Sequence, residues 1–405
     1  MTQRYFAEPY RFIGPEESTW FIDLFRHITP YYYPWALNLK RWSFPGLEHL
    51  KESYQKNAGI LLCSNHQSGM DPLLLGKLAE ASGRWIHFIA SHHLLKEGEI
   101  MGEVIRRLGG YSIFRDGPDL MSVKKTIELL REGKRAVLVF PEGTYYKQND
   151  RIGPLLEGTG LILRKALQKA TRPIVIHLIA VKYWFLEDPM PSLRLKWSRL
   201  EKEWGLLDAS LEDDLTRLEA ILSKGIERLL GKEAKTCLQP GRLGSGDFDT
   251  ALGQMVAKHF EVKPISDGDT KGPTWSAIRK LRQGLIKDLV LTAGFPKEEE
   301  AIQEKLSMLL KWENVTSLSM GYVREKPTVE RIWETFARLE EALTDCESTF
   351  PVPVEVVLSV SKGIDLSPQA RPLDLDPQKG EFGSRLREKM QAHLDSITLK
   401  SPVVL

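Results

Sequence analysis

The sequence predicts an α/β protein whose mostly parallel sheet is flanked by helices, followed by a large region of helical character. Short apolar runs alternate with helical segments between residues 46 and 199, which is typical of a parallel sheet covered by helices. Residues 200–349 carry apolar residues at helical spacing, with charged residues between them. β character returns at 352–360, before one more helix near 380–396.

Residues 1–45 are an unusually aromatic N-terminal segment. Trp20, Trp42 and the aromatic run 31–35 are interleaved with the basic residues Arg26 and Arg41. Amphipathic rings beside basic side chains suit the level of lipid headgroups, which predicts a short interfacial helix near 17–28 followed by an aromatic loop. The alternative is an arm that packs on the protein's own core.

Alternation of apolar runs and helical spacing then predicts the elements of the α/β region. The expected strands are 58–63, 85–90, 110–115, 136–140 and 173–184, and the expected helices are 72–82, 97–108, 118–132 and 157–170. Ligands of parallel sheets collect where the carboxyl ends of the strands meet the loops. His66, Arg115 and Glu142 directly follow three expected strands. All three side chains could therefore lie together at the edge of the sheet where the strands have their carboxyl ends.

The helical region is expected to contain long amphipathic helices joined by two flexible connectors. The helices are expected at 213–230, 248–260, 275–291, 297–312 and 328–343. The connectors 238–249 and 262–273 are rich in Gly, Asp and Pro, so they are expected to be loops.

Charge is divided unevenly along the 405 residues. Residues 1–200 hold 28 Lys and Arg against 20 Asp and Glu, or +8, whereas the remainder holds 28 against 34, or −6. A basic first half suits an anionic membrane surface or phosphate-bearing substrates, and no nucleic-acid partner is expected. The three cysteines form no metal or disulfide pattern, and no apolar run approaches the roughly 18 residues that span a bilayer. We therefore expect a cytoplasmic protein that associates peripherally with a membrane.

The loop after the first expected strand holds a histidine and an aspartate five residues apart, His66 and Asp71. Pro72 can occupy the first position of a helix, so Asp71 is expected to be its N-cap. A histidine folded back onto this carboxylate would be held in one tautomer, with its other nitrogen free to take a proton from a hydroxyl. Taken alone, the same pattern also fits a structural cap beside an ordinary loop histidine.

Three further segments accompany this pair. Asn65-His66 with Asp71 is followed by Gly109-Gly-Tyr-Ser-Ile-Phe-Arg115, Phe140-Pro-Glu-Gly-Thr144 and the apolar strand 173–180. In this order and spacing they resemble the four sequence blocks of the glycerolipid acyltransferases, the family that includes glycerol-3-phosphate and 1-acylglycerol-3-phosphate acyltransferases.

The resemblance implies transfer of a fatty acyl chain from acyl-CoA or acyl-carrier protein to the hydroxyl of a lysophospholipid, with 1-acylglycerol 3-phosphate as the leading acceptor. His66 would be the general base and Asp71 its orienting partner, with direct attack by the acceptor and no cofactor or metal. Arg115 would bind a phosphate, although an isolated arginine could equally pair with Asp116 or Asp119.

The third block, Phe140 to Thr144, would bind the acceptor headgroup through Glu142, Gly143 and Thr144. The family's sheet commonly closes with a late strand and helix, which implies that residues 350–398 complete the core and that 200–349 is an insertion.

The chain departs from the family pattern at two positions. Tyr145 stands where arginine is frequent, and Lys147 or Arg151 could replace the missing charge. Ser112 stands where phenylalanine is usual. These departures affect the identity of the acceptor more than the reaction.

Three other functions stay open at this point. One is a remodelling acyltransferase for another lysolipid, and a second is a non-catalytic lipid-binding scaffold. The third is a metal-dependent hydrolase with His66, Asp71 and Glu142 as ligands, although no second histidine lies at ligand spacing. His177, in the fourth block, is expected to be a satisfied core residue. Acyl-chain length, oligomeric state and the role of the helical region do not follow from the sequence.

Overall fold

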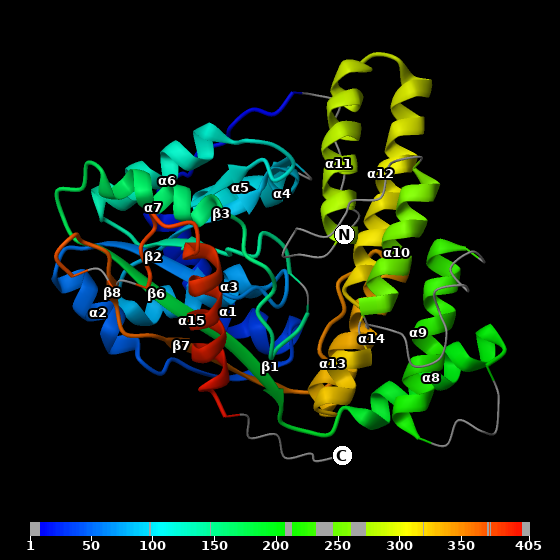
Figure 1. Cartoon of the computed structure of the whole chain (residues 1–405). Coiled ribbons are helices and arrows are strands. Elements are labelled where there is room, and N and C mark those ends of the chain that lie inside the picture. The colour runs from blue at the N-terminus through cyan, green and yellow to red at the C-terminus, as the bar shows by residue number, and fades with distance from the viewer. Residues whose placement is uncertain are drawn as a thin grey trace. The chain divides into compact units, whose positions relative to one another are not determined.

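The protein divides into two compact units in this computed structural model (Figure 1). The sheet unit comprises Tyr10–Trp184 and Val354–Lys400, and the helical unit includes Phe185–Pro353. The structure describes residues 9–96, 99–145, 147–206, 213–231, 246–260, 273–318, 320–370, 372 and 374–398. Residues 10–45 therefore lie within the sheet unit, whose first part ends at Trp184.

Parallel strands build the sheet, which confirms the predicted fold class. In the described part of the chain the sheet has eight strands in the order β1-β7-β6-β2-β5-β3-β4, with β8 antiparallel beside β6. The strands are β1 (Leu39–Ser43), β2 (Gly59–Ser64), β3 (His87–Ser91), β4 (Gly110–Ile113), β5 (Val137–Val139), β6 (Ile174–Phe185), β7 (Val354–Val360) and β8 (Ile364–Asp365). The five strands expected between 58 and 184 are all present.

Strand β2 lies in the middle of the sheet, between β5 and β6. Cys63 of β2 pairs in register with Val139 on one side and Leu178 on the other. Leu61, Leu62 and Cys63 are fully buried because helices cover both faces of the sheet. This double burial explains why β2 is a continuous apolar run rather than an alternating one.

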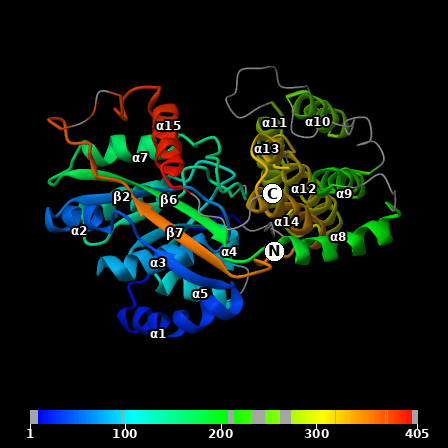
Figure 2. The same ribbon diagram turned by 90° about the horizontal axis from the view of Figure 1, so that it is seen from below.

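Helices cover the two faces of the sheet in two groups (Figure 2). On one face, α6 (Leu120–Glu132), α7 (Gly158–Leu167) and α15 (Phe382–Asp395) pack against strand side chains such as Leu61 and Ile176. On the other face lie α1 (Thr19–Ala36) and α3 (Asp71–Ser82), with α2 (Leu47–Gln55) beside α3. Two short helices, α4 (His92–Lys96) and α5 (Glu99–Arg107), connect β3 to β4.

Helix α1 is longer than the sequence predicted. Residues 31–35, expected as a loop, are helical although Pro30 and Pro34 lie inside the helix. Pro30 cannot donate to the carbonyl of Arg26, and the hydroxyl of Thr29 donates to that carbonyl instead, at 3.4 Å. Tyr33 is fully buried and its hydroxyl donates to the carbonyl of Leu73 at 2.8 Å. Packing of this tyrosine against α3 therefore outweighs the helix-breaking tendency of the prolines.

The segment before α1 covers the edge of the sheet at β4. The N–H of Ser112 donates to the carbonyl of Ile13 at 2.9 Å, and the N–H of Ile13 donates to the hydroxyl of Ser112 at 2.8 Å. Glu17 forms an antiparallel bridge with Leu108. An edge strand needs such cover because its unpaired main-chain groups attract other strands. Ser112, which departs from the family pattern, thus holds this segment in place.

The segment after the helical unit contributes β7, β8 and α15 to the sheet unit. Strand β7 pairs in parallel with β1, with Val354 opposite Leu39. Helix α15 places Phe382, Leu386 and Leu394 in the same apolar cluster as β2 and β6.

The helical unit consists of long helices in the described residues. These are α8 (Met190–Trp204), α9 (Asp214–Leu230), α10 (Gly246–His259), α11 (Pro273–Leu291), α12 (Pro296–Thr316), α13 (Met320–Glu325) and α14 (Val329–Thr344). Helix α8 was not predicted, and the fully buried Trp197 anchors it against Phe336 of α14. Most of the two expected connectors lies outside the described residues, and 246–249 are helical. Among the helices in the described ranges, none combines the length and apolar character needed to cross a bilayer.

Gly59, at the start of β2, is expected to tolerate no side chain. A Cβ there would lie 2.0 Å from the carbonyl oxygen of Leu130 and 2.8 Å from Cδ1 of Ile174. Gly59→Ala should therefore lower the free energy of unfolding by about 3 kcal/mol or more, measured by urea denaturation. Gly158→Ala is the control, because a Cβ at Gly158 of α7 meets nothing within 4 Å. Equal stability of the two variants would contradict the packing described for β2.

Candidate active site

The loop between β2 and α3 brings His66 and Asp71 together. Nδ1 of His66 lies 2.8 Å from Oδ2 of Asp71. The same oxygen accepts the N–H groups of Gln67 and Ser68, at 2.5 and 3.0 Å. The Asp71 side chain is only 2 % exposed, so these three contacts compensate the carboxylate for its lost hydration. The pair predicted from the sequence is therefore formed, and the main chain around it holds the carboxylate fixed.

The His66 imidazole is held in an orientation that suits a general base. A carboxylate at Nδ1 favours the tautomer in which Nδ1 carries the hydrogen and Nε2 can accept a proton. The ring stacks on Phe140 with centroids 4.0 Å apart and planes 19° apart. The His66 side chain is 16 % exposed, and Nε2 has no hydrogen-bond partner among the described residues. This nitrogen can therefore receive a proton from a bound molecule.

Asp71 differs slightly from its expected place in the helix. Met70 is the N-cap residue and Asp71 is the first residue of α3, with Pro72 next. The carboxylate turns back toward the preceding loop and still lies at the positive end of the helix dipole. Its charge is thus favoured by the helix as well as by the N–H groups of the loop.

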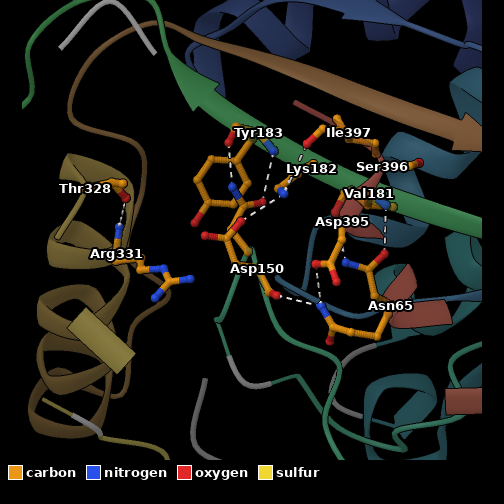
Figure 3. Close-up of polar contacts among 12 residues, drawn as sticks. Asn65, Asp150, Val181, Lys182, Tyr183, Thr328, Arg331, Asp395, Ser396 and Ile397 are labelled. Atoms are coloured by element: carbon orange, nitrogen blue, oxygen red, sulfur yellow. Dashed lines mark hydrogen bonds and ion pairs between the residues drawn. The ribbon is translucent and has the colours of Figure 1, made fainter. Parts of the chain in front are cut away.

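Asn65 fixes the main chain directly before His66 to the neighbouring strand β6. Its Nδ2 donates to the carbonyl of Val181 at 2.9 Å, and its Oδ1 accepts the N–H of Val181 at 2.7 Å (Figure 3). Regular pairing of β2 with β6 ends at Ser64 and Ile179. The amide of Asn65 therefore continues the ladder for one more step. Its place in the first sequence block was the only sign of this role.

Glu142, expected to contact an acceptor headgroup, is instead buried and bonded to the main chain. It is 2 % exposed. Its Oε1 accepts the N–H of His66 at 3.0 Å and its Oε2 accepts the N–H of Gly153 at 2.6 Å. Burial raises the pKa of this carboxyl to about 7, and the two N–H groups oppose that shift. Glu142 thus joins the third block of the sequence to the first.

Gly143 and Arg115 complete the connection among the blocks. Gly143 has a φ of 73°, and a Cβ there would lie 2.3 Å from Cδ1 of Leu156, so only glycine fits this turn. Nη1 of Arg115 donates to the carbonyl of Gly143 at 3.2 Å. Within the described chain, Arg115 makes this contact rather than an ion pair with Asp116 or Asp119.

The residues after Gly143 differ in their access to the site. Thr144 is half-buried, as is Tyr145. The Tyr145 ring meets the His66 imidazole at an angle of 60°, with centroids 5.6 Å apart, so a neutral aromatic side chain lies where arginine is frequent. Lys147, one of two expected replacements for that arginine, is 4 % exposed and faces the protein interior. Arg151, the other, is partly exposed.

His177 lies in the core, as expected. Its Nε2 is 2.8 Å from the hydroxyl of Ser53 and its Nδ1 is 2.8 Å from the carbonyl of Ser361. Burial lowers the pKa of this histidine.

A metal centre finds no support in the geometry. No group of three or more His, Cys, Asp or Glu side chains within the described ranges is arranged to hold an ion. Oδ2 of Asp71 and both carboxylate oxygens of Glu142 already accept N–H groups.

Comparisons with known proteins give two matches, both to acyltransferases. Residues 46–181 match the family model described as Acyltransferase. The chain is 28 % identical over 94 residues to the 1-acyl-sn-glycerol-3-phosphate acyltransferase of Bacillus subtilis (strain 168). That alignment covers 23 % of this chain and 45 % of the relative, so the chain spans less than half the length of the protein it matches.

Ionisation of Glu142 should make the fold less stable as the pH rises. Its pKa of about 7 exceeds the ordinary 4.5, so the folded protein binds this proton more tightly than the unfolded chain does. The resulting stabilisation is complete below about pH 4.5 and is lost as the pH rises to about 7. We expect wild type to lose about 2 kcal/mol relative to Glu142→Gln between about pH 5 and pH 8, measured by urea denaturation. The same pH dependence in both proteins would contradict the assignment.

Proposed function

The chain belongs to the glycerolipid acyltransferase family through residues 46–181, and on this premise we propose that it transfers a fatty acyl chain from acyl-CoA or acyl-carrier protein to the hydroxyl of a lysophospholipid. The leading acceptor is 1-acylglycerol 3-phosphate, for which the Bacillus subtilis relative is named.

The observation that carries the proposal is the His66–Asp71 pair with its open Nε2. In the proposed reaction, Nε2 takes the proton of the acceptor hydroxyl while the hydroxyl oxygen bonds to the thioester carbonyl carbon. Asp71 stabilises the imidazolium that forms. The carbon–sulfur bond then breaks, and the leaving thiolate takes the proton from His66. No acyl-enzyme is needed, since the acceptor attacks the thioester directly.

Arg115 supports a phosphate-bearing acceptor. Its Nη1 is held by the carbonyl of Gly143, which fixes the guanidinium beside the third sequence block. Its Nε–H is buried and has no hydrogen-bond partner among the described residues. A buried donor without a partner is costly, and a phosphate oxygen would satisfy it with a charge-assisted bond.

A second acceptor class is favoured by Tyr145. With this ring against His66 in place of the frequent arginine, the site has one fewer positive charge for a phosphate monoester. A remodelling acyltransferase that acts on another lysolipid, such as a lysophospholipid with a substituted phosphate, fits this difference.

Support for membrane contact comes from one face of α1. Its exposed apolar side chains recur every three or four residues, so they form a single stripe along the helix. They are Trp20 (60 % exposed), Leu24 (47 %), Ile28 (52 %), Tyr31 (80 %) and Trp35 (84 %), with Tyr32 (36 %) beside Tyr31. Tryptophan and tyrosine favour the interface between lipid and water, and the basic first half of the chain suits anionic lipid. In this proposal α1 lies in the membrane surface, from which the acceptor reaches His66.

Loss of the imidazole should abolish the reaction without unfolding the protein. We expect His66→Ala to lower kcat by about 10²–10⁴ in an assay with acyl-CoA, anionic vesicles and a panel of lysophospholipids. His259→Ala, an exposed histidine of the helical unit, is the control and should keep full activity. A wild-type rate in His66→Ala would contradict the proposal. Preference for an acceptor other than lysophosphatidate would change only the assigned acceptor and would leave the proposed reaction in place.

Charge placed on the α1 stripe should weaken membrane binding. We expect the double variant Tyr31→Glu and Trp35→Glu to bind vesicles of phosphatidylglycerol and phosphatidylcholine at least about 10-fold more weakly in a sedimentation assay. Leu195→Glu is the matched control, because Leu195 of α8 is also apolar and 58 % exposed. An equal loss in the control, or none in the double variant, would count against contact through α1.

A further inference from the structure

Helix α15 bonds directly to the main chain of the loop that follows the third sequence block. Oε1 of Gln391 accepts the N–H of Ile152 at 2.8 Å, and its Nε2 donates to the carbonyl of Asp150 at 2.9 Å. One turn earlier, Arg387 donates to the carbonyls of Ile152 and Gly153, at distances between 3.0 and 3.1 Å. Two side chains on one face of α15 therefore fix successive peptide groups of this loop.

The same loop bonds to the active site from its other side. The N–H of Gly153 donates to Glu142 at 2.6 Å, and the second oxygen of Glu142 accepts the N–H of His66 at 3.0 Å. The contacts thus run without interruption from α15 through the peptides of Ile152 and Gly153 to Glu142, and from there to the main chain of the proposed base.

Two contacts with β6 hold the beginning of the loop. The side-chain amide of Asn149 accepts from the N–H of Tyr183 and donates to its carbonyl, at 3.0 and 2.6 Å. Nζ of Lys182 lies 2.9 Å from Asp150, and both side chains are less than 10 % exposed (Figure 3). Nζ also donates to the carbonyl of Ile397, after α15, at 3.4 Å. The loop is therefore anchored at Tyr183 and Lys182, and Gln391 sets the path between these anchors and Gly153.

We propose that Gln391 and Arg387 are positioning residues for the acyl transfer, which fix Glu142 through Gly153 and thereby fix the base His66. This inference rests on the proposed function. It makes α15 part of the active-site structure through contacts with the main chain of this loop. Gln391 is the stronger of the two because it is partly buried, whereas Arg387 is exposed and its bonds compete with water.

The charge of Glu142 explains why the position of Gly153 matters. Both carboxylate oxygens accept N–H groups, and a protonated oxygen would present a hydrogen where another hydrogen already lies. Asp71 nearby favours the protonated form, whereas Arg387 favours the ionised form. Burial is the largest cause of the raised pKa of Glu142, and displacement of Gly153 removes one of the two N–H donors that oppose this shift.

The kinetic test compares three variants of α15 with wild type. Gln391→Met keeps the size of the side chain but removes its hydrogen bonds, and we expect kcat to fall about 10-fold while KM for donor and acceptor stays within about 2-fold. Arg387→Ala should lower kcat less, and should shift the acidic limb of the kcat–pH profile to higher pH. Arg385→Ala is the control, since Arg385 lies on the same helix with a side chain 48 % exposed and pairs with Glu388.

A double-mutant cycle tests whether Gln391 acts through Glu142. In the Glu142→Gln background, Gln391→Met should lower kcat by less than about 2-fold, because the connection is already broken. The proposal would be overturned if the two substitutions together lowered kcat by the product of their separate effects. It would also be overturned if wild type were active and Gln391→Met had the same kcat as wild type. A wild type without acyl transfer to any acceptor would instead overturn the proposed function.

Amide hydrogen exchange gives a measurement that does not depend on turnover. In the full-length protein, Gln391→Met should speed exchange of the Gly153 and His66 amides about 10-fold, followed by NMR, while amides of β2 and β6 keep their rates. Arg385→Ala should leave all of these rates unchanged. Unchanged exchange at Gly153 and His66 in Gln391→Met would overturn the proposal even if kcat fell, since the loss would then have another cause.

Discussion

The carboxylate of Glu142, buried between two main-chain N–H groups, joins the loop after β2 to the loop that leads to α7. His66 lies 76 residues before it, and Gly153 lies 11 residues after it. A carboxylate removed from water needs such donors, and the donors are main-chain groups that only a fixed loop can supply. The position of the proposed base, the turn at Gly143 and the path of the loop to α7 therefore depend on one another.

Strand β6 extends this dependence beyond the active site. Regular pairing between β2 and β6 ends at Ser64, yet β6 continues to Phe185. Two asparagines bond to this part of β6, Asn65 at Val181 and Asn149 at Tyr183, and each satisfies both main-chain groups of its partner. The loop of the first block and the loop after the third block are thus both bonded to the same strand.

Local patterns predicted the sheet well because a strand that is buried on both faces is a continuous apolar run in the sequence. The strands β2 to β6 and the His66–Asp71 pair were recognised from apolar runs and from loop position. The helical course of residues 31–35 was missed because it is stabilised by a contact with another helix, from Tyr33 of α1 to Leu73 of α3. The main-chain contacts of Glu142 were not predicted, since a glutamate in a Pro-Gly turn looks solvated until the partners of its oxygens are known. Contacts from α15 have no sequence signal at all.

The contact between Ile152 and Gln391 joins residues 239 positions apart in the chain. Every residue assigned to the reaction has left the ribosome long before Gln391 is synthesised, and the helical unit lies between them in the sequence. A nascent chain can therefore form β2 to β6 early, but the contacts between α15 and the loop at Gly153 form only after α15 has been synthesised. Long-range contacts of this kind slow folding. In the proposed mechanism, the base His66 is fully fixed only once α15 has packed against this loop.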